Sequence, residues 1–232
     1  MNSDNPTRKI SLNLVAICIF GMTISSLVVP LINISSTIPI AIIWAIIVGA
    51  TLDNFLFKSI VATLILDTIA GDKPAYRQRI VNHEAGHFLV AYLLDIPITG
   101  YTLSAWESLK AGQAAQGGVM FSAPQANISS QLLQRYCTVW MAGIAAEKLI
   151  YDRSEGGSED RQKLRGTLFL AGKQQQEIVQ QENLAALKAK TLIQTNWEAY
   201  QALVIAMSNR TAVADCCTQI DQLKLPNTNP LP

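Results

Sequence analysis

The chain has 232 residues, of which 50% are hydrophobic and only 15% are charged, against about 25% in typical soluble domains. A formal net charge of +1 gives no electrostatic case for nucleic-acid binding, and the high apolar content excludes intrinsic disorder. The shortage of charge is uneven, because no Asp, Glu, Lys or Arg occurs from Ile10 to Leu52. The sequence therefore predicts a membrane anchor joined to a domain of more ordinary charge content.

The uncharged stretch is long enough for two membrane-spanning helices, each of which needs about 20 mainly apolar residues. We expect one over residues 12–32 and one over residues 38–57, within an anchor of residues 10–57 that follows a tail of residues 1–9. The turn between the two spans is supplied by Pro30, Asn33, Ser35, Ser36 and Thr37. A cleaved signal peptide is the weaker interpretation, because its apolar core would be only about 7–15 residues long.

Basic residues flank the outer ends of this predicted hairpin but are missing from its turn. Arg8 and Lys9 precede the first span, and Lys58 follows the second. Because cytoplasmic loops are enriched in Lys and Arg, we expect an integral membrane protein with both termini on the cytoplasmic or stromal side. Residues 58–72 are too short to span the membrane on their own and are predicted to form a connector or interfacial helix.

A single domain of residues 73–224 is expected to follow, with a C-terminal tail of residues 225–232. Its length is sufficient for one hydrophobic core. Apolar residues at helical spacing, together with helix-start signals, predict a mainly α fold. The predicted helices begin at Pro74, at the capping residues Ser129 and Ser158, and over residues 174–194 and 197–207.

The four cysteines lack the CxxC spacing that is typical of zinc and redox sites. They are Cys18, Cys137 and the adjacent pair Cys216 and Cys217. We therefore expect free, mainly buried thiols in a reducing compartment.

The sequence His83-Glu84-Ala85-Gly86-His87 carries the clearest chemical signal. Its two histidines are four residues apart on a predicted helix, so both imidazoles lie on one face and can bind one Zn²⁺. They are the only histidines in the chain, and they lie in an otherwise apolar helix where unpaired polar side chains would cost stability. Glu84, beside the first ligand, is suited to act as general base.

A catalytic zinc site needs a third protein ligand. Because no other histidine exists, this ligand is expected to be a carboxylate, and less plausibly a cysteine. Spacing alone does not separate the candidates Glu147, Glu155, Glu159 and Asp160. For Glu159 and Asp160, a purely structural alternative is a favourable charge near a helix N-terminus, worth a few tenths to about 1 kcal/mol.

Together these motifs resemble the peptidase domain of the FtsH family, which are membrane-anchored, ATP-dependent zinc proteases. Three blocks match in order: His83–His87, Ala142–Glu147 (AGIAAE) and Gly156–Asp160 (GGSED). The resemblance implies a helical peptidase domain in which Asp160 is the third zinc ligand. It also implies that Glu147 is a supporting residue near the site.

A fourth and weaker match consists of Gly117, Gly118, Val119 and Met120. In the FtsH family this segment is a strand near the catalytic cleft. The resemblance therefore implies a small β element in the domain, to which a substrate peptide could pair by strand addition.

The sequence also departs from the FtsH pattern, because the family normally carries an ATPase module between anchor and peptidase domain. Here only residues 58–72 separate the two, and no GxxxxGK[ST] phosphate loop occurs. The chain resembles short relatives from photosynthetic lineages that lack the module, which implies a photosynthetic membrane. We expect a zinc metalloendopeptidase without its own ATPase, acting on protein or peptide substrates. Its expected partners are a full-length FtsH-type protease or further copies of itself.

Two other functions fit part of the pattern. A non-hydrolytic accessory or scaffold subunit of an FtsH-type complex would need no catalytic residues, yet Glu84 and the ligands are all present. A site-2-type intramembrane zinc protease is similar in residues 87–91, but its motif lies within the membrane. Here the motif helix begins with Arg77 and Arg79, and no later segment has about 18 consecutive apolar residues.

Overall fold

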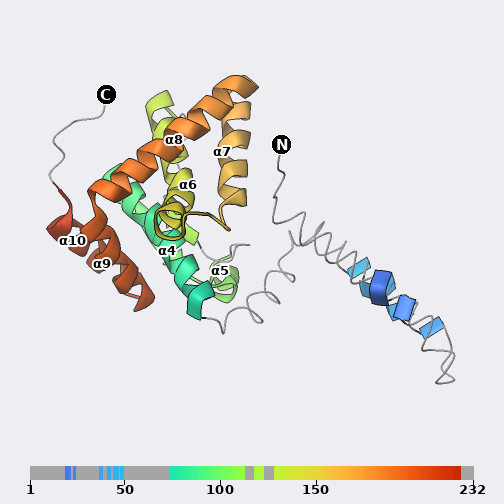
Figure 1. The fold of residues 1–232 in the computed structure, drawn as a ribbon. Coiled ribbons are helices and arrows are strands. Elements are labelled where there is room, and N and C mark those ends of the chain that lie inside the picture. Colours follow the sequence, from blue (N-terminus) through green and yellow to red (C-terminus); the bar gives the residue numbers. More distant parts are fainter. Residues whose placement is uncertain are drawn as a thin grey trace. The chain divides into compact units, whose positions relative to one another are not determined.

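The computed structural model describes residues 19–21, 23–24, 37–38, 41–42, 44–46, 48–49, 74–112, 118–122 and 128–225. The chain divides into two compact units, Met1–Thr63 and Leu64–Pro232. The described residues of the first unit are helical (Figure 1). Within the described part of the chain, no helix combines the length and apolarity needed to cross a membrane. Most of the predicted anchor, and residues 1–9 and 58–72, lie outside the described residues, so the two spans stay a prediction.

The second unit is mainly α with one small sheet, as the sequence predicts in outline (Figure 1). In chain order its elements are α4 (Pro74–Leu93), β1 (Ile98–Thr102), α5 (Ala105–Lys110), β2 (Gly118–Phe121), α6 (Ser130–Tyr151), α7 (Ser158–Leu170), α8 (Gln175–Thr195), α9 (Trp197–Ser208) and α10 (Val213–Leu223). The sequence did not lead us to expect β1, α5 or α10.

Most of the predicted helix starts are confirmed. Helix α4 begins at Pro74, and α8 and α9 lie within one residue of the predicted ranges. The Ser129 hydroxyl accepts a hydrogen bond from Leu132 N at 3.1 Å and so caps α6, as expected. The predicted cap at Ser158 is wrong, because Gly157 is the N-cap of α7 and Ser158 is its first residue. Gly157 has φ of 84°, a left-handed conformation that glycine adopts without strain.

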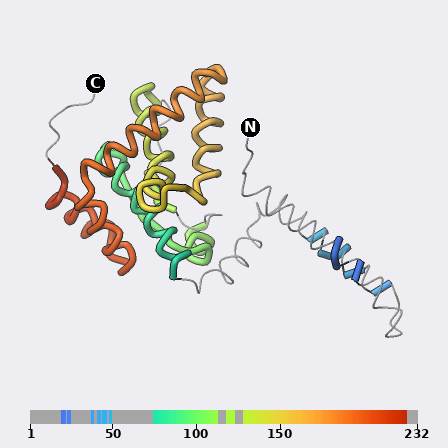
Figure 2. The backbone as a smooth tube through the Cα atoms, in the orientation of Figure 1, coloured from blue at the N-terminus to red at the C-terminus, as the bar shows by residue number. Residues whose placement is uncertain are grey.

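Helices α4 and α6 form the centre of the core, with α8 packed on α6 and α9 packed on α4 (Figure 2). Small residues allow the two central backbones to approach closely. A Cβ atom added at Gly86 would lie 2.7 Å from Ala142 O and 2.8 Å from Ala146 Cβ. Phe88 and Leu89, which follow Gly86 in α4, are fully buried. The HExxH segment is therefore held inside the core of the domain.

Strands β1 and β2 pair antiparallel and form a two-stranded sheet that lies against α4. Tyr101 of β1 packs edge-on against Phe88, with ring centroids 6.1 Å apart. The segment that the FtsH resemblance implies to be a strand is one at Gly118, Val119 and Met120. Gly117 lies outside the described residues.

The cysteines of this unit are free thiols, as the sequence predicts. Cys137 and Cys216 are buried and Cys217 is partly buried. Cys18 lies outside the described residues.

Candidate metal centre

The structure brings together His83 and His87 from α4 and Asp160 from the first turn of α7. Asp160 Oδ2 lies 3.2 Å from His83 Nε2 and 3.3 Å from His87 Nε2. One possible ligand atom of each residue lies within 4.8 Å of the other two. Around a tetrahedral zinc ion with bonds of about 2.0–2.1 Å, neighbouring ligand atoms are about 3.3 Å apart. The spacing of this group therefore fits a single zinc ion.

The hydrogen bonds of the two histidines fix which ring nitrogen faces the centre. His87 Nδ1 lies 2.7 Å from Val139 O, a carbonyl that can only accept, so Nδ1 carries the hydrogen. His83 Nδ1 lies 2.7 Å from Glu147 Oε1 and donates in the same way. In neutral imidazoles both Nε2 lone pairs then point towards a carboxylate oxygen, an arrangement that is repulsive without a cation. Such outer hydrogen bonds are typical of metal-binding histidines.

The charges around His83 favour a cation at the same place. Burial lowers the pKa of His83, but hydrogen bonds to Asp160 and Glu147, together with the charges of Glu84 and Asp160, outweigh burial and raise it to about 10. Burial likewise opposes ionisation of Asp160, but attraction to His87 and hydrogen bonds from His83 and His87 hold its pKa well below the usual range. The centre therefore stabilises positive charge beside Nε2, where a metal ion can replace the proton. Two imidazoles and one carboxylate are a donor set that suits Zn²⁺.

Glu84 lies beside the first histidine and has one unused oxygen. The residue is buried, and its Oε2 has no hydrogen-bond partner among the described residues. Burial raises its pKa, while the two histidines act in the opposite direction. A buried carboxylate oxygen needs a polar partner such as water or a substrate group. Glu84 is thus placed to exchange a proton with a molecule in the site.

Glu147 belongs to the outer layer of the centre and is 1% exposed. Its Oε1 accepts from His83 Nδ1 and, at 3.3 Å, from Gly156 N. Its Oε2 accepts from Arg79 Nη1 at 2.8 Å and from Glu155 N at 2.9 Å. Burial would raise the pKa of Glu147, but these bonds together lower it to about 2. Glu147 therefore orients the His83 ring and is outside the group of residues that could hold a metal ion.

The remaining carboxylates that the sequence left as candidates are not part of the group. Glu155 and Glu159 are exposed. Glu155 forms ion pairs with Arg79 at 3.5 Å and Arg153 at 3.3 Å. Of the four candidate carboxylates, only Asp160 contributes an oxygen to the cluster with the two histidines.

Several residues that shape the centre were missed by sequence reasoning. A Cβ atom at Gly143 would come closer than 3.0 Å to three atoms of the His83 ring. At Gly156 it would lie 2.8 Å from Glu147 Oε1. Both glycines belong to the matched blocks AGIAAE and GGSED, so their place in these blocks could have signalled close packing. Arg79, by contrast, carries no motif signal, and only the fold shows its role.

The strand expected to receive substrate lies against α4, the helix that carries the two histidines. Strand β2 contacts α4 and pairs with β1 alone among the described residues. The Met120 side chain covers Gly100 of β1, since a Cβ atom at Gly100 would lie 2.6 Å from Met120 Cε. Because β1 is the only strand paired with β2 among the described residues, the other edge of β2 is unpaired there.

The fold and the site together define a mainly α domain with a buried candidate metal centre. Neither the protein-family models nor the curated proteins that were compared match this chain. What the centre does is therefore inferred from its own donor atoms and their geometry.

Proposed function

We propose that the chain is a membrane-anchored zinc metalloendopeptidase similar to the peptidase domain of the FtsH family. The observation that supports this most strongly is the convergence of His83 Nε2, His87 Nε2 and Asp160 Oδ2. The unpartnered Glu84 carboxylate belongs to the same HExxH segment. These are the parts that peptide hydrolysis by activated water requires.

Each protein group has a distinct part in the proposed reaction. Zn²⁺ held by the three ligands would supply Lewis-acid polarisation of a peptide carbonyl and make water a better nucleophile near neutral pH. Glu84 accepts the proton of the attacking water on its free oxygen and delivers it to the leaving amine. Val139 O and Glu147 Oε1 hold the two Nδ1–H groups, so that both Nε2 atoms stay directed at the ion.

The proposed substrates are extended segments of proteins or peptides. Strand addition beside Gly118, Val119 and Met120 would use the unpaired backbone groups of β2. Only chains that are already unfolded, or loosely folded, can adopt that extended form. Folded substrates would need unfolding by a partner, for which a full-length FtsH-type ATPase protease at the same membrane is our proposal.

The test uses the full-length chain in detergent, with an unfolded casein-like substrate and no ATP. Zinc-loaded wild type is expected to cleave the substrate, and Glu84→Gln is expected to retain zinc but lose cleavage by at least about 100-fold, as for a general base. Glu159→Gln is the matched control, because Glu159 is exposed and outside the metal group, and it should cleave like wild type. Equal cleavage by wild type and Glu84→Gln would contradict the proposal. A zinc-loaded wild type without any cleavage would favour the accessory-subunit alternative.

A further inference from the structure

We propose that Arg79 is a positioning residue that sets the metal affinity of the centre. It does so by fixing Glu147 and the turn of residues 155–157 at the same time. The inference rests on the metal site of the proposed function but not on peptide hydrolysis. Its basis is a connected set of contacts from Arg79 to two of the three ligands.

Arg79 is held on three sides in the structure. Its Nη1 donates to Glu147 Oε2 at 2.8 Å, and its Nη2 lies 3.5 Å from Glu155 Oε1. The guanidinium carbon lies 4.2 Å from the centroid of the Tyr151 ring, which is a cation–π contact. The Arg79 side chain is 19% exposed and its partner Glu147 is 1% exposed. This pair therefore differs from ordinary surface ion pairs, which contribute little.

The first connection runs through Glu147 to His83. Arg79 lies four residues before His83, on the same face of α4. The Glu147 carboxylate bridges them, with Oε2 on Arg79 and Oε1 on His83 Nδ1. Because Arg79 holds one oxygen, the other is fixed towards the imidazole. Arg79 thus determines the orientation of the His83 ring without contacting the metal group.

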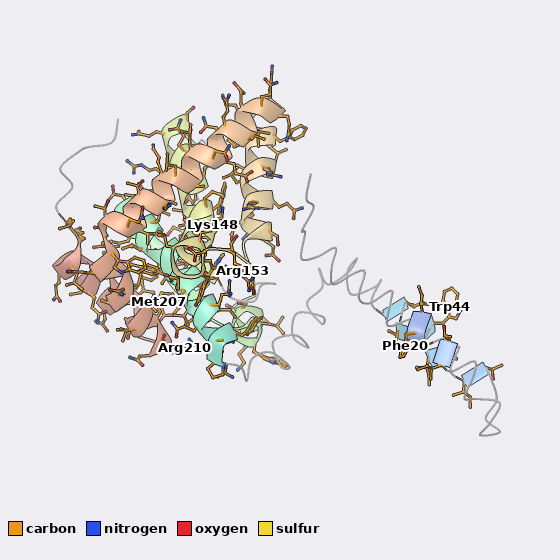
Figure 3. The ribbon with its side chains drawn as sticks, in the orientation of Figure 1. Phe20, Trp44, Lys148, Arg153, Met207 and Arg210 are labelled. Atoms are coloured by element: carbon orange, nitrogen blue, oxygen red, sulfur yellow. The ribbon has the colours of Figure 1, made fainter. Side chains whose placement is uncertain are left out.

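The second connection runs through the turn to Asp160. The backbone amides of Glu155 and Gly156 donate to the same carboxylate, and Arg79 also reaches the Glu155 side chain. Gly157, the next residue, is the N-cap of α7, whose first turn carries Asp160. Arg153, which is labelled in Figure 3, also contacts Glu155, but its side chain is 77% exposed. Of the two arginines that contact Glu155, Arg79 is therefore the more buried one.

His87, the remaining residue of the metal group, is held independently of Arg79. His87 Nδ1 is fixed by Val139 O, a backbone group of α6, and not by the Glu147 carboxylate that Arg79 holds. Loss of Arg79 should therefore loosen two ligands and leave one in place. The expected result is a weakened and distorted site, with metal still bound at higher concentration.

A lysine at this position should be only a partial substitute. The guanidinium fork can meet two carboxylates and stack on a ring, whereas an ammonium is a compact point charge. Arg79→Lys should therefore keep the contact with Glu147 and lose those with Glu155 and Tyr151. The ranking of wild type above Arg79→Lys above Arg79→Met is a specific expectation of the positioning role.

The experiment measures Co²⁺ and Zn²⁺ affinity of the full-length protein by chelator competition, together with the Co²⁺ absorption spectrum. We expect Arg79→Met to lower affinity by about 10–100-fold, as for other outer partners of metal ligands, and to change the Co²⁺ spectrum. Arg165→Met is the matched control, because Arg165 of α7 forms an ion pair with Glu182 at 2.6 Å, outside the metal group. Its affinity and spectrum should equal those of wild type.

A double-mutant cycle separates positioning from general loss of structure. In a Glu147→Gln background, Arg79→Met should lower affinity by clearly less than it does in wild type, because both connections use the Glu147 carboxylate and only the direct contact with Glu155 is left to lose. An Arg79→Met variant that binds metal as tightly as wild type would overturn the inference. An effect of Arg79→Met that is as large in the Glu147→Gln background as in wild type would overturn it too. If Arg79→Met does not fold, Arg79→Lys with wild-type affinity and spectrum would overturn it equally. Metal binding without peptide cleavage would contradict the proposed function alone, and a wild type that binds no Co²⁺ would contradict both.

Discussion

Gly143 of α6 leaves room for the His83 imidazole of α4. A Cβ atom at position 143 would come closer than 3.0 Å to the Nε2, Cδ2 and Cε1 atoms of that ring. The part of the His83 ring that carries Nε2 therefore lies directly against the backbone of α6. This relationship explains the AGIAAE segment in structural terms, since Gly143 leaves room for the His83 ring and Glu147 orients it.

Substitution of this glycine should damage the metal centre more than the fold. Gly143→Ala should lower zinc affinity by at least about 10-fold, because the ring must move, and destabilise the domain by about 1–3 kcal/mol through overpacking. Gly166→Ala is the matched control, since nothing lies within 4 Å of its added Cβ. The control should be neutral or stabilise α7 by up to about 1 kcal/mol. Chelator competition and thermal unfolding measure both effects, and wild-type affinity in Gly143→Ala would contradict the close packing.

Two adjacent acidic residues of α7 should differ sharply in their effect on metal binding. Loss of a hydrogen-bond partner of a metal ligand typically lowers metal affinity by about 10–100-fold. Asp160→Ala removes a proposed ligand itself, so it should reduce zinc affinity by more than about 100-fold. Glu159→Ala should bind zinc as wild type does, since Glu159 is exposed and lies outside the group. Metal analysis after dialysis distinguishes the two variants. Unchanged zinc in Asp160→Ala would exclude it as a ligand.

The metal-free protein should lose stability in acid through Glu147. Hydrogen bonds from His83, from the Glu155 amide and from Arg79 outweigh burial and lower the pKa of Glu147 from 4.5 to about 2. Between these values the unfolded chain binds more protons than the folded one, so the free energy of unfolding falls as the pH falls. Glu147→Gln should show a shallower fall over that range in urea titrations. An identical slope in the two proteins would mean that folding does not lower the pKa of Glu147.

Removal of zinc should loosen the start of α7 more than the α4–α6 core. Zinc at 100 times its dissociation constant would stabilise the folded state by about 2.7 kcal/mol, which corresponds to about 5–10 °C in Tm for a domain of this size. Chelation should therefore lower Tm and increase amide hydrogen exchange in residues 155–163, where Asp160 is anchored. Exchange in residues 85–91 should change little, because they are buried in the core. A uniform increase across both segments would contradict this division.

Sequence reasoning was most successful where local pattern decides structure. Pro74 at a helix start, apolar spacing and the Ser129 cap were sufficient to predict α4 and α6. The N-cap of α7 was misplaced because the cap depends on a left-handed glycine, Gly157, and not on a side-chain hydrogen bond from Ser158. Periodicity also gave no warning of β1, which is stabilised by its partner strand and by Phe88.

The candidate site shows the same division between local and long-range information. The pair His83 and His87 follows from helical geometry alone. The choice of Asp160 among four carboxylates required either the FtsH resemblance or the fold, because 77 residues separate it from His83. Arg79 could not be found from its neighbours, since its partner Glu147 is 68 residues away and no motif joins them.

Anomalous diffraction at the zinc absorption edge, on crystals of the zinc-loaded protein, tests the central claim most directly. The account predicts one strong peak about 2.0–2.2 Å from His83 Nε2, His87 Nε2 and a carboxylate oxygen of Asp160. Glu147 should remain outside bonding distance and hydrogen-bonded to His83 Nδ1. A peak at another place in the domain, or no peak in protein that retains its fold, would contradict the metal centre described above.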